Sequence, residues 1–398
     1  MTSAVSVEKL RAWWAHRQGL DGGLAGATAA EVLAGSGWAR SIGSSTPYLA
    51  LFARAGLDRE QVDADVAGLA IHELPSARGC AYLLPQRDFA LGLTLGLAAA
   101  VADVSTATRK LPVTQQEIDE LGGTVLAILE AAGTPLDPAA IRERAGSAVR
   151  SLGEEGKKKG HGTTLPMTLG LLQSRGQIRR VPAGGRLDQQ RFSYVRWSAP
   201  AYPADLDAAH AELARLYFGW AAPASLKHFQ WFAGLSATAA RKAVAQVPLV
   251  PVAGAEHLLL PADLVEQFAA FVVPPEPSYA LVTAFDGIHL LHRDLGRLLD
   301  GPDAARPVPG GKPGRTLGDE PDPPTMIIVD RGRVAGLWEY DVEAGDIAYQ
   351  SFGASDGALK EAVARTADYI RDQLGDARTV SLDSPRSRAP RIAALRAG

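Results

Sequence analysis

The pattern of hydrophobic and polar positions predicts helices followed by a hairpin in the middle of the chain. Apolar residues recur at helical spacing, and Thr114 and Asp137 stand where two of the helices begin. Two alternating stretches around a glycine-rich tip then predict paired strands. The predicted helices are 114–131, 139–149 and 163–175, and the predicted strands are 178–181 and 191–197. This order is typical of a winged helix-turn-helix unit.

The next stretch, 204–275, repeats the helical part of this arrangement. Its predicted helices are 206–219, 225–232 and 236–245. Pro223 separates the first two helices, and Gly234-Leu235-Ser236 forms a short turn between the second and the third. A glycine-containing turn between two short helices is typical of a helix-turn-helix.

The two ends of the chain differ from each other in pattern. The first 112 residues fit a third winged unit, with helices at 6–18, 27–33 and 47–55 and a wing at 70–84. The last block alternates as strands at 279–285, 325–330, 334–340 and 347–352, and a helix from Asp356 to Leu374 closes it. The Pro/Gly-rich stretch 300–324 is interpreted as a mobile tether rather than a functional flap.

We therefore predict an α+β fold with tandem winged helix-turn-helix domains and a small antiparallel β-domain that ends in a helix. The predicted domains are 1–112, 113–203, 204–275 and 276–398.

Composition narrows the class of protein. The 398 residues are 46% hydrophobic and 21% charged, as in folded globular proteins. Cys80 is the single cysteine, and no cluster of cysteines and histidines suggests a metal site, so we expect no metal or cofactor. The weakly polar run 89–102 is too short for a membrane span and is interpreted as a buried helix. Charged residues near the N-terminus argue against an export signal, so a cytoplasmic, nucleoid-associated location is expected.

Charge is distributed unevenly along the chain. The formal net charge is −3, yet residues 141–200 hold 12 Lys or Arg against four acidic residues, a local balance of +8. Such asymmetry favours a polyanionic partner, above all double-stranded DNA. A solvated basic face balanced by acidic neighbours is the alternative, and charge alone leaves both open.

The candidate DNA-binding residues follow from this distribution. They are Lys157, Lys158, Lys159, Arg175, Arg179, Arg180, Arg186 and Arg191 in the basic segment, and Arg241 and Lys242 in the third predicted helix of 204–275. The lysine run is flanked by Gly156 and Gly160 and precedes a helix, so its ammonium groups could follow a phosphate backbone. A solvated loop is the alternative.

Three stretches of the sequence resemble a known bacterial family. They are Tyr217 to Val244, Ala284 to Asp300 with the text AFDGIHLLHRDLGRLLD, and Ile327 to Tyr340 with the text IIVDRGRVAGLWEY. The chain resembles the winged-helix DNA-binding family that includes the AlkZ/YcaQ-type DNA glycosylases, from about residue 6 to 375. The resemblance implies tandem winged helices and a terminal β-domain around duplex DNA.

The resemblance also implies positions for catalysis, and these positions are altered. Family members with repair activity excise alkylated or crosslinked purines with a Gln-apolar-Gln or Gln-apolar-Asp motif, which positions a water and stabilises a positively charged sugar. Matching the family's Ala-Arg to Ala53-Arg54 places this motif on Arg40-Ser41-Ile42. A second family stretch, Arg-Gly-Thr-Leu-His, falls on Arg78-Gly79-Cys80-Ala81-Tyr82. Amide, carboxylate and imidazole groups are therefore missing at Arg40, Ile42 and Tyr82.

We accordingly expect a noncatalytic protein that binds duplex or damaged DNA, with Arg40 and Arg78 also contacting phosphates. Two alternatives stay open. One is a glycosylase whose catalytic group has moved, to Glu31 or Asp21. The other is a protein-interaction scaffold. Whether the protein is an enzyme is therefore left uncertain, leaning towards no, and its oligomeric state is not predicted.

Other polar residues have structural interpretations. Cys80 and Tyr82 are expected to pack within a wing strand. His289 and His292 are three residues apart but lack acidic or histidine partners, so packing or surface roles are favoured over metal binding. Asp286, Arg293 and Asp294 match a family pattern that implies a structural ion pair.

Overall fold

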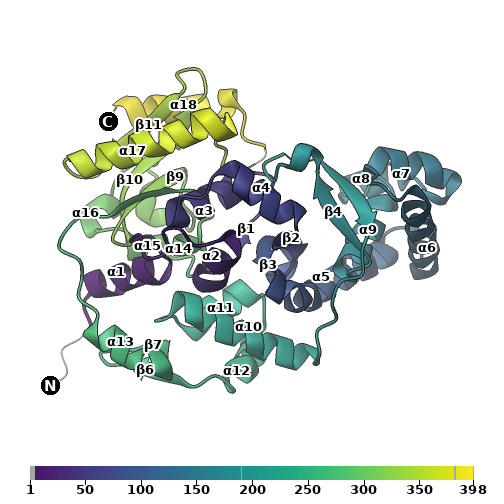
Figure 1. Cartoon of the computed structure of the whole chain (residues 1–398), viewed down its shortest axis with the longest axis horizontal. Helices are drawn as coiled ribbons and strands as arrows, with labels where there is room; N and C mark the ends of the chain where they lie inside the picture. The colour runs from purple at the N-terminus through teal and green to yellow at the C-terminus, as the bar shows by residue number, and fades with distance from the viewer. Residues whose placement is uncertain (1–4, 190, 381, 398) are drawn as a thin grey trace.

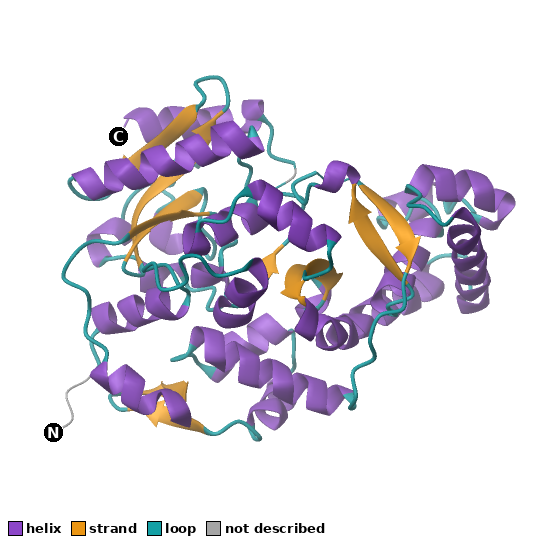
Figure 2. Cartoon of the chain, in the orientation of Figure 1, coloured by secondary structure: helices purple, strands orange, loops and turns teal. Residues whose placement is uncertain are grey.

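Small antiparallel sheets surrounded by helices make up the computed structural model, which describes residues 5–189, 191–380 and 382–397 (Figure 2). The α+β class is confirmed. The first segment, 1–112, holds α1 (Val7–Arg17), α2 (Ala29–Ser36), β1 (Ala39–Arg40), α3 (Thr46–Ala55), α4 (Arg59–Ala67), β2 (Ile71–Pro75), β3 (Ala81–Pro85) and α5 (Phe89–Lys110). Its three strands pair in the order β1-β3-β2, so the hairpin predicted at 70–84 is confirmed and gains a third strand.

The basic segment projects from one end of the molecule (Figure 1). It holds α6 (Gln115–Ala132), α7 (Pro138–Ala145), α8 (Gly153–Lys158), α9 (Leu165–Ser174), β4 (Ile178–Pro182) and β5 (Phe192–Arg196). Thr114 and Asp137 cap α6 and α7 as predicted, because each side chain accepts a hydrogen bond from a backbone N–H of the first turn. Helix α9 is buried along most of its length and packs against α5 and α6.

The third segment places its helices along the bottom of the view in Figure 1. It holds α10 (Leu206–Ala221), α11 (Leu226–Ala233), α12 (Ala237–Val244), the hairpin β6 (Leu249–Val252) with β7 (Ala255–Pro261), and α13 (Val265–Ala270). Gly234 ends α11 at a φ of 69°, and Ser236 caps α12, so the predicted turn between the two helices is confirmed. The hairpin β6–β7 was not predicted.

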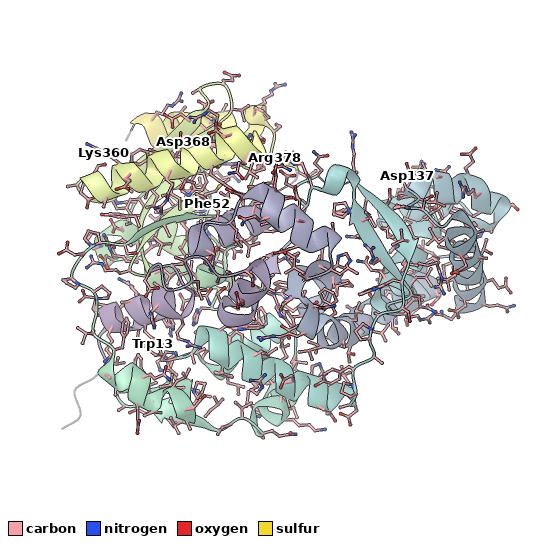
Figure 3. The ribbon with its side chains drawn as sticks, viewed as in Figure 1. Trp13, Phe52, Asp137, Lys360, Asp368 and Arg378 are labelled. Carbon is pink, nitrogen blue, oxygen red and sulfur yellow. The ribbon has the colours of Figure 1, made fainter. Side chains whose placement is uncertain are left out.

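The last segment forms a four-stranded sheet of order β11-β10-β9-β8. Its elements are β8 (Tyr279–Val282), α14 (Gly287–Leu290), α15 (Leu295–Leu298), α16 (Gly301–Ala304), β9 (Met326–Asp330), β10 (Arg333–Asp341), β11 (Asp346–Ser351), α17 (Gly357–Tyr369) and α18 (Pro385–Ala397). Figure 3 labels Phe52 on α3 beneath α17, where its ring stacks on Tyr369 at 3.9 Å between centroids. The four predicted strands are confirmed, whereas α18 was not predicted.

The interpretation of 300–324 as a mobile tether was wrong. Leu317 is almost fully buried in the main hydrophobic core, and Asp303 binds Arg306 at 2.8 Å. The bridge between Pro307 and Thr316 closes the stretch on itself. Buried apolar and paired charged side chains therefore fix it against the sheet.

The core joins segments that are far apart in the sequence. One buried cluster includes Trp13 and Trp14 of α1, Phe232 of α11 and Leu337 of β10, while the basic segment has a core of its own. The domain boundaries stay a prediction.

Residues 86–110 around α5 are apolar and long enough to cross a membrane by length and composition alone. In the fold, α5 packs against α9 and α10.

Candidate active site and nucleic-acid interface

The strand β1 ends at Arg40, the first position of the family motif. Arg40 lies opposite Tyr82 of β3, so their side chains share one face of the three-stranded sheet. The Arg40 guanidinium carbon lies 5.3 Å from the centre of the Tyr82 ring, and Nη1 donates to the backbone oxygen of Ala81 at 2.6 Å. Burial raises the pKa of the Tyr82 hydroxyl. This face holds a cation–aromatic pair where family members carry amide and imidazole groups.

The other face of the same sheet holds a buried carboxylate. Ser41 follows β1, and its hydroxyl donates to Oε2 of Glu73 in β2 at 2.5 Å. Arg180 of β4 donates from Nη1 to Oε1 of Glu73 at 3.1 Å. The Glu73 residue is 3% exposed, whereas the Arg180 side chain is 30% exposed. The carboxylate is thus fixed by the middle residue of the motif and covered by a cation that reaches solvent.

Sequence reasoning did not find Glu73. The available signal was an acidic residue in the middle of the apolar strand Ile71–Pro75, where burial without a partner is unfavourable. Its two partners lie 32 and 107 residues away in the sequence, so spacing could not reveal them.

A second cluster lies where the β2–β3 turn meets the α11–α12 turn. The guanidinium carbon of Arg78 lies 4.2 Å from the ring centre of Trp231, and that of Arg293 lies 4.9 Å from it. A Cβ on Gly234 would come within 2.7 Å of the Arg78 side chain, so the turn requires glycine there. Arg293 is bound to Asp322 at 2.6 Å, but Arg78 makes no ion pair with any described residue. Arg78 is therefore an exposed, pre-positioned cation.

Many of the predicted DNA-binding cations have acidic partners nearby. The pairs are Lys157–Glu154, Lys158–Glu155, Lys159–Glu155, Arg175–Asp119, Arg186–Asp188 and Lys242–Asp207, at 2.7, 3.6, 3.8, 3.4, 2.5 and 2.5 Å. Arg179 is half-buried in β4, while Arg191 and Arg241 are exposed. Local pairing reduces the field that the basic segment presents, and the DNA-binding role of these residues stays a prediction.

The two carboxylates suggested as relocated catalytic groups serve local turns. Glu31 accepts hydrogen bonds from the backbone N–H and the hydroxyl of Thr28, both at 2.8 Å, and completes the capping box of α2. The bond from the backbone N–H lowers the pKa of this exposed carboxyl. Asp21 binds Nδ1 of His16 at 2.6 Å and accepts from the N–H of Gly23.

The histidines of the last segment are buried. Nε2 of His292 bonds the backbone oxygen of Ala221 at 2.9 Å, and burial lowers its pKa to about 3. Burial likewise lowers the pKa of His289 to about 4. In the part of the chain that the structure describes, no three His, Cys, Asp or Glu residues gather as a metal site.

The structural ion pair expected in this segment has a different partner. Asp286 is bound by both Nη atoms of Arg54, at 2.8 Å each, inside the protein. Arg293 pairs instead with Asp322, and Asp294 pairs with Arg297 at 2.8 Å. The sequence located the charged residues but not the arginine on α3.

The model of the AlkZ-like DNA glycosylase family matches residues 39–371, beginning at β1. The chain belongs to this family. Among solved structures, the Streptomyces sahachiroi DNA glycosylase AlkZ is similar in fold, with a TM-score of 0.68 and 20% sequence identity over 95% of this chain and 99% of that chain. No curated protein matches the chain.

The family corrects our expectation of a noncatalytic DNA-binding protein. The family model describes AlkZ-like DNA glycosylases, and the similar structure is that of a DNA glycosylase. Both findings favour the glycosylase alternative. The expectation rested on the missing amides at Arg40 and Ile42, and it overlooked the carboxylate that the fold brings to Ser41.

Proposed function

We propose that this protein is a DNA glycosylase that hydrolyses the N-glycosidic bonds of alkylated or crosslinked bases in duplex DNA, with Glu73 as its catalytic carboxylate. The observation that carries the proposal is the 2.5 Å hydrogen bond from Ser41, the middle residue of the motif, to Glu73. A carboxylate on β2, across β3 from the motif, supplies the chemistry that the motif positions lack.

The reaction requires a base for water and a negative charge beside the sugar. As the water oxygen bonds to C1′, the bond from C1′ to the base nitrogen breaks, and its electron pair leaves with the base. Glu73 accepts a proton from the water, and its negative charge stabilises the positive sugar. An N7-alkylated purine already carries a positive charge, so it leaves as a neutral base without a proton donor.

Arg180 controls access to the carboxylate in this proposal. Its partly exposed guanidinium lies between Glu73 and solvent. A DNA phosphate near β4 competes for this guanidinium, because arginine binds phosphate as well as carboxylate. Displacement of Arg180 then uncovers Glu73 only when DNA is bound.

The surrounding segments supply the DNA contacts as tandem winged helices. Arg78 stacks on Trp231 next to the turn that precedes α12, and α12 carries the exposed Arg241. These cations can hold the phosphate backbone of a duplex, with Arg40 closer to the motif strand. We therefore also propose a location in the cytoplasm, beside the chromosome.

Base release tests the proposal directly. The protein in excess is incubated with duplex DNA containing N7-methylguanine or an alkyl crosslink, and abasic sites are counted. Glu73→Gln keeps the shape of the side chain and removes its charge, so the single-turnover rate is expected to fall by roughly 10²–10⁴. Glu339→Gln alters another buried glutamate paired with an arginine, far along the chain in β10, and should leave the rate within about twofold.

Two results contradict the proposal. If the wild-type protein forms no abasic sites, the glycosylase function is wrong. If Glu73→Gln is as fast as the wild type, Glu73 is not the catalytic group. A thermal melt of both variants checks that each is folded.

A further inference from the structure

A cleft of about 300 Å³ opens between α5, α9 and the turn that joins β2 to β3. Small residues from all three elements form its walls: Gly79, Ala81, Gly96, Ala100 and Gly170. Gly79 and Gly96 pack closely against Ala99 and Pro75, whereas the space beside Gly170 of α9 is open, so a group can enter on the α9 side. The volume is at the lower end of the range for small-molecule sites.

Two buried polar side chains line this cleft without a partner. Gln173 and Ser174, at the end of α9, are 3% and 4% exposed. Neither side chain hydrogen-bonds to any described residue. Neither group is among the fully enclosed polar atoms that lack a partner, so both open onto the cleft, where a carboxamide and a hydroxyl are available to hydrogen-bond a ligand.

The cleft adjoins the carboxylate assigned to catalysis. Arg180 lines the cleft and donates to Glu73 at 3.1 Å. Ala81 also lines it, and its backbone oxygen accepts from the N–H of Ser41 at 3.1 Å. Arg180 alone therefore separates a group bound in the cleft from Glu73, and Ala81 separates it from Ser41.

We propose that this cleft binds the damaged purine after it leaves the DNA stack, with Gln173 hydrogen-bonding to the edge of the base. The inference rests on the proposed glycosylase function, which needs access to C1′ of the damaged nucleotide. A carboxamide carries a donor and an acceptor side by side, so it can pair with the O6 and N1–H edge of an N7-alkylated guanine and with the N1 and 2-amino edge of 2-aminopurine. Enzymes that act on a base in DNA commonly extrude it into a close-fitting pocket.

A cleft-filling variant with a matched control tests this binding. Gly170→Leu puts a side chain into the cleft, and its Cβ meets no heavy atom within 4 Å. Gly123→Leu makes the same change in α6, also with no atom within 4 Å, but Gly123 does not line the cleft. The two variants therefore share the same gain in helix propensity.

The probe is a duplex with 2-aminopurine opposite a tetrahydrofuran abasic analogue, because 2-aminopurine fluoresces more strongly when it leaves the stack. The wild-type protein and Gly123→Leu should raise the fluorescence on binding, and Gly170→Leu should abolish the rise. Gln173→Ala should weaken the binding measured by this signal by about tenfold, the effect of losing a good base-edge contact. Absence of a rise with the wild-type protein, or an equal rise with Gly170→Leu, overturns the inference.

Counting abasic sites on N7-methylguanine DNA in parallel separates this inference from the proposed function. A fluorescence rise without base release leaves the cleft as a base-binding site and refutes the glycosylase function. Base release by Gly170→Leu at the wild-type rate supports the function and refutes the cleft.

Discussion

Two buried carboxylate–guanidinium pairs occupy different regions of the molecule. Glu73 of β2 is bound by Arg180 of β4, which crosses from the first segment to the basic segment. Glu339 of β10 is bound by Arg391 of α18 at 2.7 Å, which fastens the last helix to the sheet. The first carboxylate also binds Ser41, whereas Oε2 of Glu339 has no hydrogen-bond partner in the part of the chain that the structure describes, and burial raises the pKa of Glu339.

The difference teaches that burial of an ion pair does not by itself indicate function. Both glutamates are almost fully enclosed, but Arg180, the partner of Glu73, lines the cleft beside α9, whereas Arg391, the partner of Glu339, does not. The Glu339 pair holds two elements together, and the Glu73 pair joins two segments at a place where a ligand can enter. The following predictions test this contrast.

The largest expected effect is on stability in the last segment. Arg391→Met leaves the Glu339 charge buried with its main partner gone, which should lower the free energy of unfolding by roughly 3–5 kcal/mol. Arg180→Met should cost less, because Arg180 is partly solvated and Glu73 keeps its bond to Ser41. Urea denaturation measures both, and equal losses would contradict the proposed difference between the pairs.

Removal of the Ser41 hydroxyl should separate catalysis from stability. A hydrogen bond to a charged group contributes about 1.5–3 kcal/mol, so Ser41→Ala should slow base release by roughly 10–100-fold if that bond orients Glu73. Ser36→Ala also removes a buried hydroxyl, one that bonds the backbone of its own helix, and should leave the rate unchanged. Single-turnover rates of base release are measured for the two variants. A Ser41→Ala rate equal to that of the wild type would show that the bond is only structural.

Acid should weaken both regions through buried histidines. The His72 ring, next to Glu73, has no hydrogen-bond partner among the described residues and packs between Phe89 and Trp197, and burial lowers its pKa to about 3. Below its ordinary pKa of 6.5, the unfolded chain takes up a proton that the folded chain does not. Stability is therefore lost as the pH falls from 6.5 towards 3, by up to about 1.4 kcal/mol per pH unit for each such histidine.

His72→Phe should remove the part of this acid-induced loss of stability that His72 causes. Its advantage over the wild type in melting temperature should grow as the pH falls from 6.5 to 4 and should not change above pH 7.5. An unchanging difference across this range would mean that His72 is protonated in the folded protein.

The smallest expected effect concerns DNA contacts. Arg78 makes no ion pair with the residues that the structure describes, whereas Lys157 and Lys158 have acidic partners three residues away. Arg78→Ala should reduce the slope of log affinity against log salt concentration by about 0.9, the value for one phosphate contact. Replacing Lys157, Lys158 and Lys159 together by Ala should reduce the slope by less than the loss of three phosphate contacts would. A salt series on plain duplex DNA measures both, and an unchanged slope for Arg78→Ala would remove it from the interface.

Much of the secondary structure could be predicted from the sequence, because its causes are local. The spacing of apolar residues located α6, α10 and the strands β8 to β11, and the caps at Thr114, Asp137 and Ser236 marked where helices begin. Short or less regular elements, such as α8 and α18, gave too little periodicity to be found.

The candidate site could be predicted only in part. The resemblance located the motif strand at Arg40-Ser41-Ile42 and the turn at Arg78, and it showed that the usual amides were missing. The residue that replaces them in our proposal lies on another strand. Gln173 belonged to a predicted helix, but nothing in its spacing indicated that its carboxamide would lie in a cleft.

The sequence by itself determined most of the helices and strands, the resemblance to the family and the position of the altered motif, since these depend on neighbouring residues or on the order of residues in short stretches. Only the tertiary structure decided that Ser41, Glu73 and Arg180 meet, that the lysine run lies beside its own acids, and that α5 and α9 leave a cleft beside Arg180. The physical reason is that pairing of strands and packing of helices bring together residues tens to more than a hundred positions apart. A local sequence pattern does not show which of these distant residues will be in contact.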